Sequence, residues 1–130
     1  MIHRHSTRVY YEDVDLAGIV YYANYLRFYE RARSEALRAL GVDQTALRAA
    51  GLVFAVSRFE ADYLVPARFD DLLTVETETT RLGAASLHME QRILRDGAAL
   101  NRARLRVAFM DLEGRLRRMP PDLRKALAGA

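Results

Sequence analysis

Cysteine is absent from this sequence of 130 residues. Its absence excludes disulfide bonds, thiolate nucleophiles and metal or iron–sulfur sites built on cysteine. Long apolar runs are missing too: no stretch approaches the ~20 apolar residues that cross a bilayer, and none follows the first residues, Met1–Ser6. We therefore expect neither a transmembrane segment nor a secretory signal, and the cytoplasm is the expected compartment.

Lysine is nearly absent, because Lys125 is the only lysine and the other 19 basic residues are arginines. The net charge of +3 is too small to indicate a nucleic-acid partner, although a pI near 9.5 is compatible with an anionic ligand. Hydrophobic residues make up 51% and charged residues 28%, as in an ordinary globular protein. The length corresponds to a single domain over residues 1–130, in which we expect residues 1–6 and 119–130 to be peripheral.

One clear helical pattern dominates the first half of the chain. Residues 7–12 are β-branched and aromatic and predict a short strand, whereas residues 13–22 have no settled period and are interpreted as a loop. From Asn24, apolar or small residues recur at helical spacing and predict a helix of about 16 residues. Asn24 is its expected N-cap and Gly41 its left-handed C-terminal glycine, and a shorter helix is predicted at residues 43–50.

The hydrophobic period changes to two after Gly51. Residues 53–65 alternate with one slip in phase, which a β-bulge near Ser57-Arg58 would reconcile. The remaining predicted elements are strands at 73–80, 87–93 and 103–109, turns at 66–71, Asp96-Gly97 and Glu113-Gly114, and a final helical turn at 122–128. This order predicts an α+β fold with an antiparallel sheet. Its open edges need cover, so we expect at least a dimer.

The loop that leads into the long helix carries two carboxylates, Asp13 and Asp15, followed by Gly18. Gly18 permits a tight turn or a close backbone approach. The first turn of a helix presents unpaired N–H groups that can hold the oxyanion of an acyl-transfer reaction, and a nearby carboxylate can act as nucleophile or as general base on water. Amide donors beside a carboxylate suit the hydrolysis of an activated acyl group, although spacing alone does not single out thioesters.

Residues 15–25 and the helix start Leu26–Arg33 resemble the signature of the hotdog-fold 4-hydroxybenzoyl-CoA thioesterase family. Asp62–Arg68, Asp70-Asp71 and Ala85–Leu87 are also similar, so that the resemblance spans residues 7–116. Within the family it is closest to the acyl-CoA thioesterases associated with the Tol-Pal system of Gram-negative bacteria. It implies a sheet of five or six antiparallel strands around one long central helix, paired into dimers with a continuous sheet and often further into tetramers.

The same resemblance implies the site and the reaction. The catalytic aspartate of the family corresponds to Asp15, and its backbone oxyanion donor corresponds to Tyr22. The expected substrate-binding residues are Gly18, Ile19, Val20 and Asn24. The implied reaction is hydrolysis of a short- or medium-chain acyl-CoA at the dimer interface, without a metal or cofactor. The thioester of an acyl carrier protein is a further candidate substrate.

Two departures from the family pattern stand out. Tyr22 occupies a position where some close relatives in the family carry a histidine with a proposed acid–base role. Gly83–Ala85 replace a basic cluster that meets the CoA phosphates in aryl-CoA relatives. This argues against the aryl-CoA branch and leaves the phosphate contacts unassigned, with Arg68 and Arg81 as candidates.

Other interpretations of these residues stay open. Asp13 is interpreted as structural, although the aspartate pair could also bind a divalent metal through oxygen. The pair could also form an aspartyl-phosphate, but that motif follows a buried apolar strand, of which Val9–Glu12 is a poor version. His3 and His5 are expected to be mobile and His88 solvated. The arginine row (Arg102, Arg104 and Arg106) could attract the nucleotide of CoA or form a solvated or intersubunit face.

Two other classes of function compete with hydrolysis. The first is a non-catalytic module that binds acyl-CoA or acyl carrier protein. This alternative stays open because Tyr22 stands where some relatives carry a histidine. The second is nucleic-acid binding, motivated by the many arginines but not favoured, because no strand face interleaves aromatic and basic residues.

Overall fold

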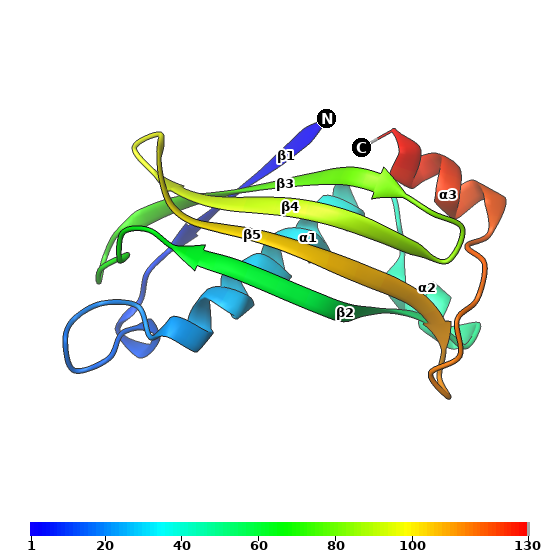
Figure 1. Cartoon of the computed structure of the whole chain (residues 1–130), viewed down its shortest axis with the longest axis horizontal. Coiled ribbons are helices and arrows are strands. Elements are labelled where there is room, and N and C mark those ends of the chain that lie inside the picture. The colour runs from blue at the N-terminus through cyan, green and yellow to red at the C-terminus, as the bar shows by residue number, and fades with distance from the viewer. Residues whose placement is uncertain (130) are drawn as a thin grey trace.

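A single five-stranded antiparallel sheet forms the body of the protein, described here by a computed structural model of residues 1–129. The spatial order is β1-β3-β4-β5-β2, and helix α1 (Tyr25–Ala39) lies across one face (Figure 1). The strands are β1 (Ile2–Arg8), β2 (Leu52–Tyr63), β3 (Leu72–Leu82), β4 (Ser86–Arg95) and β5 (Ala98–Asp111). The predicted α+β hotdog architecture is confirmed; the pairing of two copies stays a prediction.

Helix α1 forms where the helical spacing predicts it. Its buried positions recur every three or four residues and form one apolar stripe against the sheet: Tyr25, Phe28, Tyr29, Ala32 and Ala36. The helix ends at Ala39. Gly41, with a φ of +79°, and the bond from Val42 N–H to the Leu37 carbonyl complete a left-handed C-terminal turn, as predicted. The short helix α2 (Gln44–Ala49) follows, capped by Asp43.

The predicted bulge in β2 is confirmed. The register between β2 and β5 shifts between Val56 and Arg58. One extra residue reverses the side-chain alternation. As a result, Phe54 on one side of the shift stacks on Phe109, while Phe59 on the other side packs into the core under α1. The Asp96-Gly97 hairpin is also confirmed, with positive φ at both residues, as a type I′ turn requires.

Both ends of the chain differ from expectation. The predicted strand at 7–12 is wrong: β1 starts at Ile2, and Tyr11–Asp13 form the 3₁₀ turn η1. His3 and His5 are not mobile, since they pair with β3. Helix α3 (Pro121–Ala128), with Met119, adds buried side chains to a core cluster around Phe109, so neither end is merely peripheral. Among residues 1–129, no helix combines the length and apolarity that crossing a bilayer requires.

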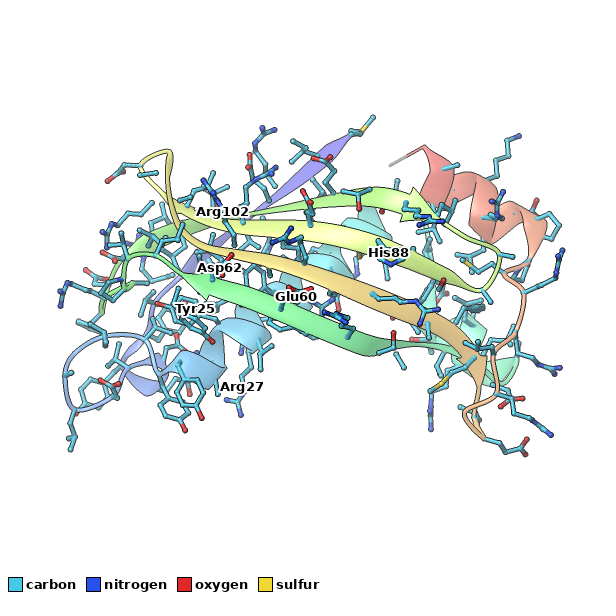
Figure 2. All side chains as sticks on the ribbon, viewed as in Figure 1. Tyr25, Arg27, Glu60, Asp62, His88 and Arg102 are labelled. Carbon is cyan, nitrogen blue, oxygen red and sulfur yellow. The ribbon has the colours of Figure 1, made fainter. Side chains whose placement is uncertain are left out.

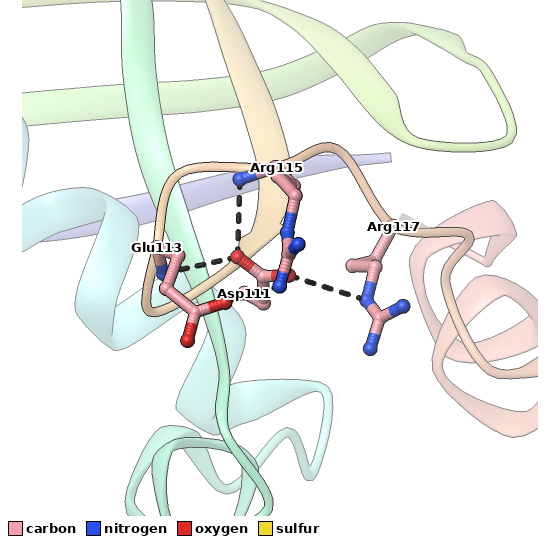
Figure 3. A network of polar contacts seen from close by, with 4 residues as sticks. All are labelled: Asp111, Glu113, Arg115 and Arg117. Carbon is pink, nitrogen blue, oxygen red and sulfur yellow. Dashed lines mark hydrogen bonds and ion pairs between the residues drawn. The ribbon is translucent and has the colours of Figure 1, made fainter.

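Asp111 organises the turn that joins β5 to the C-terminal segment (Figure 3). One carboxylate oxygen accepts from the backbone N–H groups of Glu113 and Arg115, both at 3.0 Å. The other lies 3.2 Å from Arg115 Nε and 3.6 Å from Arg117 Nε. The hydrogen bond from the Arg115 N–H, with smaller help from Glu113 N–H and the Arg115 guanidinium, outweighs desolvation and lowers the pKa of Asp111. The predicted turn at Glu113-Gly114 is thereby fixed by an ionised side chain.

The sheet face opposite α1 is charged. The arginine row alternates along β5 with buried apolar residues, so its side chains point away from the helix. The register places Asp62 beside Arg102, as Figure 2 shows. It also places Glu60 beside Arg104, and His88 of β4 opposite Arg106. This face carries both acidic and basic side chains, and these residues do not line the cavity that holds Asp15.

Candidate active site

The loop between η1 and the helix front, residues 14–21, is itself a small hairpin. Asp15 N–H donates to the Ile19 carbonyl at 2.9 Å, and Gly18 N–H donates to the Asp15 carbonyl at 3.0 Å. Gly18 has a φ of +77°, in the left-handed region that glycine adopts without strain. Gly18 therefore allows the tight turn of this hairpin. We call residues 14–21 the Asp15 loop.

A buried carboxylate closes the base of the Asp15 loop. Asp13 is 5% exposed. One of its carboxylate oxygens accepts from Asn24 Nδ2 at 2.8 Å and the other from Tyr10 N–H at 2.8 Å, while its carbonyl accepts from Tyr21 N–H at 3.0 Å. This arrangement agrees with a structural role for Asp13. Because donors occupy both oxygens, it also argues against a metal shared by Asp13 and Asp15.

Asn24 is not the N-cap that the sequence suggests. Its backbone is already helical, with φ −73° and ψ −19°, and its side chain makes no capping bond. The reason is the 3₁₀ turn η2 (Tyr22–Asn24), which runs directly into α1 and moves the helix front back to Tyr22. The Asn24 amide is instead committed to Asp13, and Asn24 does not line the cavity.

Asp15 and Tyr22 share one cavity of about 330 Å³. The Asp15 carboxylate is exposed and accepts from Ala17 N–H at 2.8 Å. Tyr22 is the first residue of η2, so its N–H has no partner within the helix. No other acceptor for this N–H is found in residues 1–129. The lining residues are Asp15, Ile19, Val20, Tyr21, Tyr22, Tyr25, Tyr63, Leu64, Val65 and Pro66.

The far wall of this cavity comes from the end of β2 and the turn after it. Val20 N–H donates to the Ala67 carbonyl at 2.8 Å, and Ala67 N–H donates to the Tyr25 hydroxyl at 3.0 Å. Asp71 accepts from Arg68 N–H at 2.8 Å and from Arg95 at 2.6 Å. Burial alone would raise the pKa of Asp71, but these two donors outweigh it and lower that pKa. An ionised carboxylate thus braces the turn that faces the Asp15 loop.

A profile of the Thioesterase-like superfamily matches residues 9–127 of the chain. The chain belongs to this superfamily. This thioesterase-like protein is 48% identical over 106 residues to the acyl-CoA thioesterase YbgC of Haemophilus influenzae, covering 81% of this chain and 78% of the relative. It is 42% identical over 122 residues to the acyl-CoA thioester hydrolase YbgC of Escherichia coli O6:H1, covering 92% and 91%.

The solved structures agree with this assignment. The crystal structure of a probable thioesterase from Bartonella henselae superposes on the thioesterase-like chain with a TM-score of 0.88 at 42% identity. The match covers 92% of this chain and 100% of the other.

Four of the six predicted site residues of the thioesterase-like chain meet in the cavity: Asp15, Ile19, Val20 and Tyr22. Gly18 shapes the turn and Asn24 holds the loop base. The reasoning from sequence did not assign Tyr63, Leu64, Val65 and Pro66 to the site. The only available signal for them was the family-like segment 62–68, because β2 and the Asp15 loop lie far apart in sequence.

Proposed function

We propose that this protein is an acyl-CoA thioester hydrolase that works in the cavity of Asp15 and Tyr22. The observation that carries the proposal is that one exposed carboxylate and one unpaired helix-front N–H line the same cavity. The names of the relatives from H. influenzae and E. coli support the reaction class.

The proposed chemistry uses two groups. The thioester carbonyl oxygen accepts from Tyr22 N–H, which stabilises the negative charge that develops on that oxygen. Asp15 then either attacks the carbonyl carbon, giving a mixed anhydride that water hydrolyses, or removes a proton from an attacking water. In both routes the C–S bond breaks with its electron pair on sulfur, and the CoA thiolate leaves.

No histidine takes part in this scheme. His3 and His5 lie in β1, His88 lies on the charged outer face, and none lines the cavity. Asp15 is the only carboxylate among the lining residues of the described chain. A thioester can be hydrolysed without a separate general acid, because a thiolate leaves without prior protonation.

The cavity suits a short or medium acyl chain. Apart from Asp15, its walls consist of aliphatic side chains, a proline and tyrosines. Its volume of about 330 Å³ lies at the lower end of the range of small-molecule sites. We therefore propose short- or medium-chain acyl-CoA as the substrate, with acyl carrier protein as an alternative carrier and the cytoplasm as the expected location.

A second copy of the chain is proposed to complete the site. The cavity opens at the end of β2, an edge strand with no neighbour beyond it. Around the opening, Tyr63, Leu64 and Val65 are each about half exposed. A homodimer whose sheet continues across this edge would cover them and shield Asp15 from water, and a tetramer would be built from such dimers. Light scattering on the purified protein measures the assembly.

The deciding experiment is thiol release from an acyl-CoA series of increasing chain length. Asp15→Asn keeps the size of the side chain and removes its charge, so kcat should fall on the order of 10²- to 10⁴-fold. Asp122→Asn is the matched control, since Asp122 is exposed in α3, at the opposite end of the sheet from the Asp15 loop (Figure 1). Full turnover by Asp15→Asn on every substrate that the wild type cleaves would overturn the mechanism.

A non-catalytic acyl-binding module is the second candidate. The observation that favours it is that the Asp15 carboxylate already accepts a hydrogen bond from Ala17 N–H and is exposed in the single chain. Saturable binding of acyl-CoA by the wild type, with no thiol released at any chain length, would identify this function instead.

A further inference from the structure

We propose that Tyr63 is a positioning residue that holds the helix front in place through its hydroxyl group. The inference rests on the proposed function, because it concerns the peptide whose N–H is proposed to bind the thioester oxygen. It adds a residue from a different part of the fold to that site.

The central contact is a hydrogen bond between the sheet and the helix front. Tyr63 Oη donates to the carbonyl oxygen of Tyr22 at 2.8 Å. The ring of Tyr63 stands edge-on to that of Tyr25, with the centroids 5.3 Å apart and the planes at 89°. The tyrosine therefore contacts the first turn at two points, the backbone of residue 22 and the side chain of residue 25.

The other contacts of the helix front run to the loop before it and do not reach the backbone of Tyr22 through a side chain. The turn η2 is three residues long, and no side chain caps it. Its other contacts include backbone bonds from Tyr21 N–H to Asp13 and from Asn24 N–H to Tyr21, and the side-chain bond from Asn24 Nδ2 to Asp13. Among residues 1–129, Tyr63 is the only side chain that bonds a backbone atom of Tyr22. Loss of its hydroxyl would leave the orientation of that residue to a short turn at the mouth of a cavity.

Tyr63 is itself held by a rigid part of the fold. It is the last residue of β2, directly opposite Asn101 of β5. Asn101 is fully buried, and its side chain accepts from the Tyr29 hydroxyl of α1 at 2.6 Å. The helix front is thereby tied to the sheet as well as to the loop before it.

The hydroxyl acts as a donor and not as an acid or base. Burial, and then the neighbouring Tyr25 and Tyr22, raise the pKa of Tyr63 above its ordinary value of 10.0. The group stays protonated at neutral pH, as donation to a carbonyl requires.

Tyr63→Phe tests the proposal, because it keeps the ring and removes the donor. We expect kcat for acyl-CoA to fall roughly 3- to 10-fold, the factor that corresponds to one neutral hydrogen bond, with KM within about 2-fold. The pH profile should keep its shape, because no titrating group is lost. Tyr11→Phe is the matched control: Tyr11 is exposed and outside the cavity.

Amide hydrogen exchange separates positioning from a merely structural effect. In Tyr63→Phe, exchange should accelerate at Asn24 and Tyr25, whose N–H groups are hydrogen-bonded in the first turn, while the melting temperature and exchange in the sheet stay as in Tyr11→Phe. Unchanged exchange at Asn24 and Tyr25, or unchanged kcat in an active enzyme, overturns the proposal. If the wild type releases no thiol but exchange still accelerates, the proposed function fails and the positioning role stands.

Discussion

Removal of the Asp13 carboxylate should destabilise the whole protein, although Asp13 pairs with no cation. The carboxylate is buried and accepts from Asn24 Nδ2 and from Tyr10 N–H, both at 2.8 Å. Each hydrogen bond to a charged group contributes about 1.5–3 kcal/mol, and loss of the acceptor leaves the buried Asn24 amide without a partner, whereas water can reach the Tyr10 N–H more easily. For Asp13→Ala we therefore expect the free energy of unfolding to fall by about 2–4 kcal/mol, allowing for some entry of water.

Asp13→Asn should cost less, about 1–2 kcal/mol. Its amide oxygen can still accept from Tyr10 N–H, and the amide of Asn24 can rotate to present its own oxygen to the new NH₂ group. The loss is then mainly that of the charge. The loss of unfolding free energy should therefore be larger in Asp13→Ala than in Asp13→Asn.

Urea unfolding followed by circular dichroism measures both variants, since the chain has no tryptophan for fluorescence. Asp62→Ala serves as the control, because Asp62 is exposed on the outer sheet face. The reasoning is refuted if Asp13→Ala, like this control, stays within about 0.5 kcal/mol of the wild type.

Two further predictions concern the turn at Gly18 and the turn after β5. Gly18→Ala should lose about 1–2 kcal/mol in urea unfolding, because no atom lies near the added Cβ and the cost is the strain of a φ of +77°; Gly18→Asn should lose less, and equal stability of Ala and Gly would contradict this. Asp111→Asn should remove acid sensitivity. A carboxyl with a lowered pKa stabilises the fold above the unfolded-state pKa of about 4 and loses that contribution as the pH falls through its native pKa. Unfolding free energy measured from pH 6 down to pH 3 should therefore decline less steeply in Asp111→Asn than in Asp122→Asn, and parallel curves would exclude the effect.

Elements defined by local pattern were predictable from the sequence. Three such features are the apolar stripe of α1, the left-handed Gly41 and the Asp96-Gly97 hairpin. Each depends on residues that are close together in the sequence. The bulge near Arg58 was also visible, because a strand buried on one face cannot change phase without an extra residue. The Asp15 loop and its approach to the helix front belong to the same class, since they are contiguous in sequence.

The remaining features depend on residues brought together from distant parts of the chain. Strand β1 is an edge strand that pairs only with β3, and its polar sequence does not show the alternation by which a strand is predicted. The aromatic residues Tyr10 and Tyr11 suggested a strand instead, but both are exposed and no strand forms there. Asn24 could not be assigned from its type, because Asp13 competes with the helix for its side chain. The tyrosine at the end of β2 reaches Tyr22 across 41 residues. Sequence by itself determined the long helix, the four later strands and the turns between them, because those preferences are local. Only tertiary packing decided the walls of the cavity, because its contacts exist once the sheet has closed over the helix.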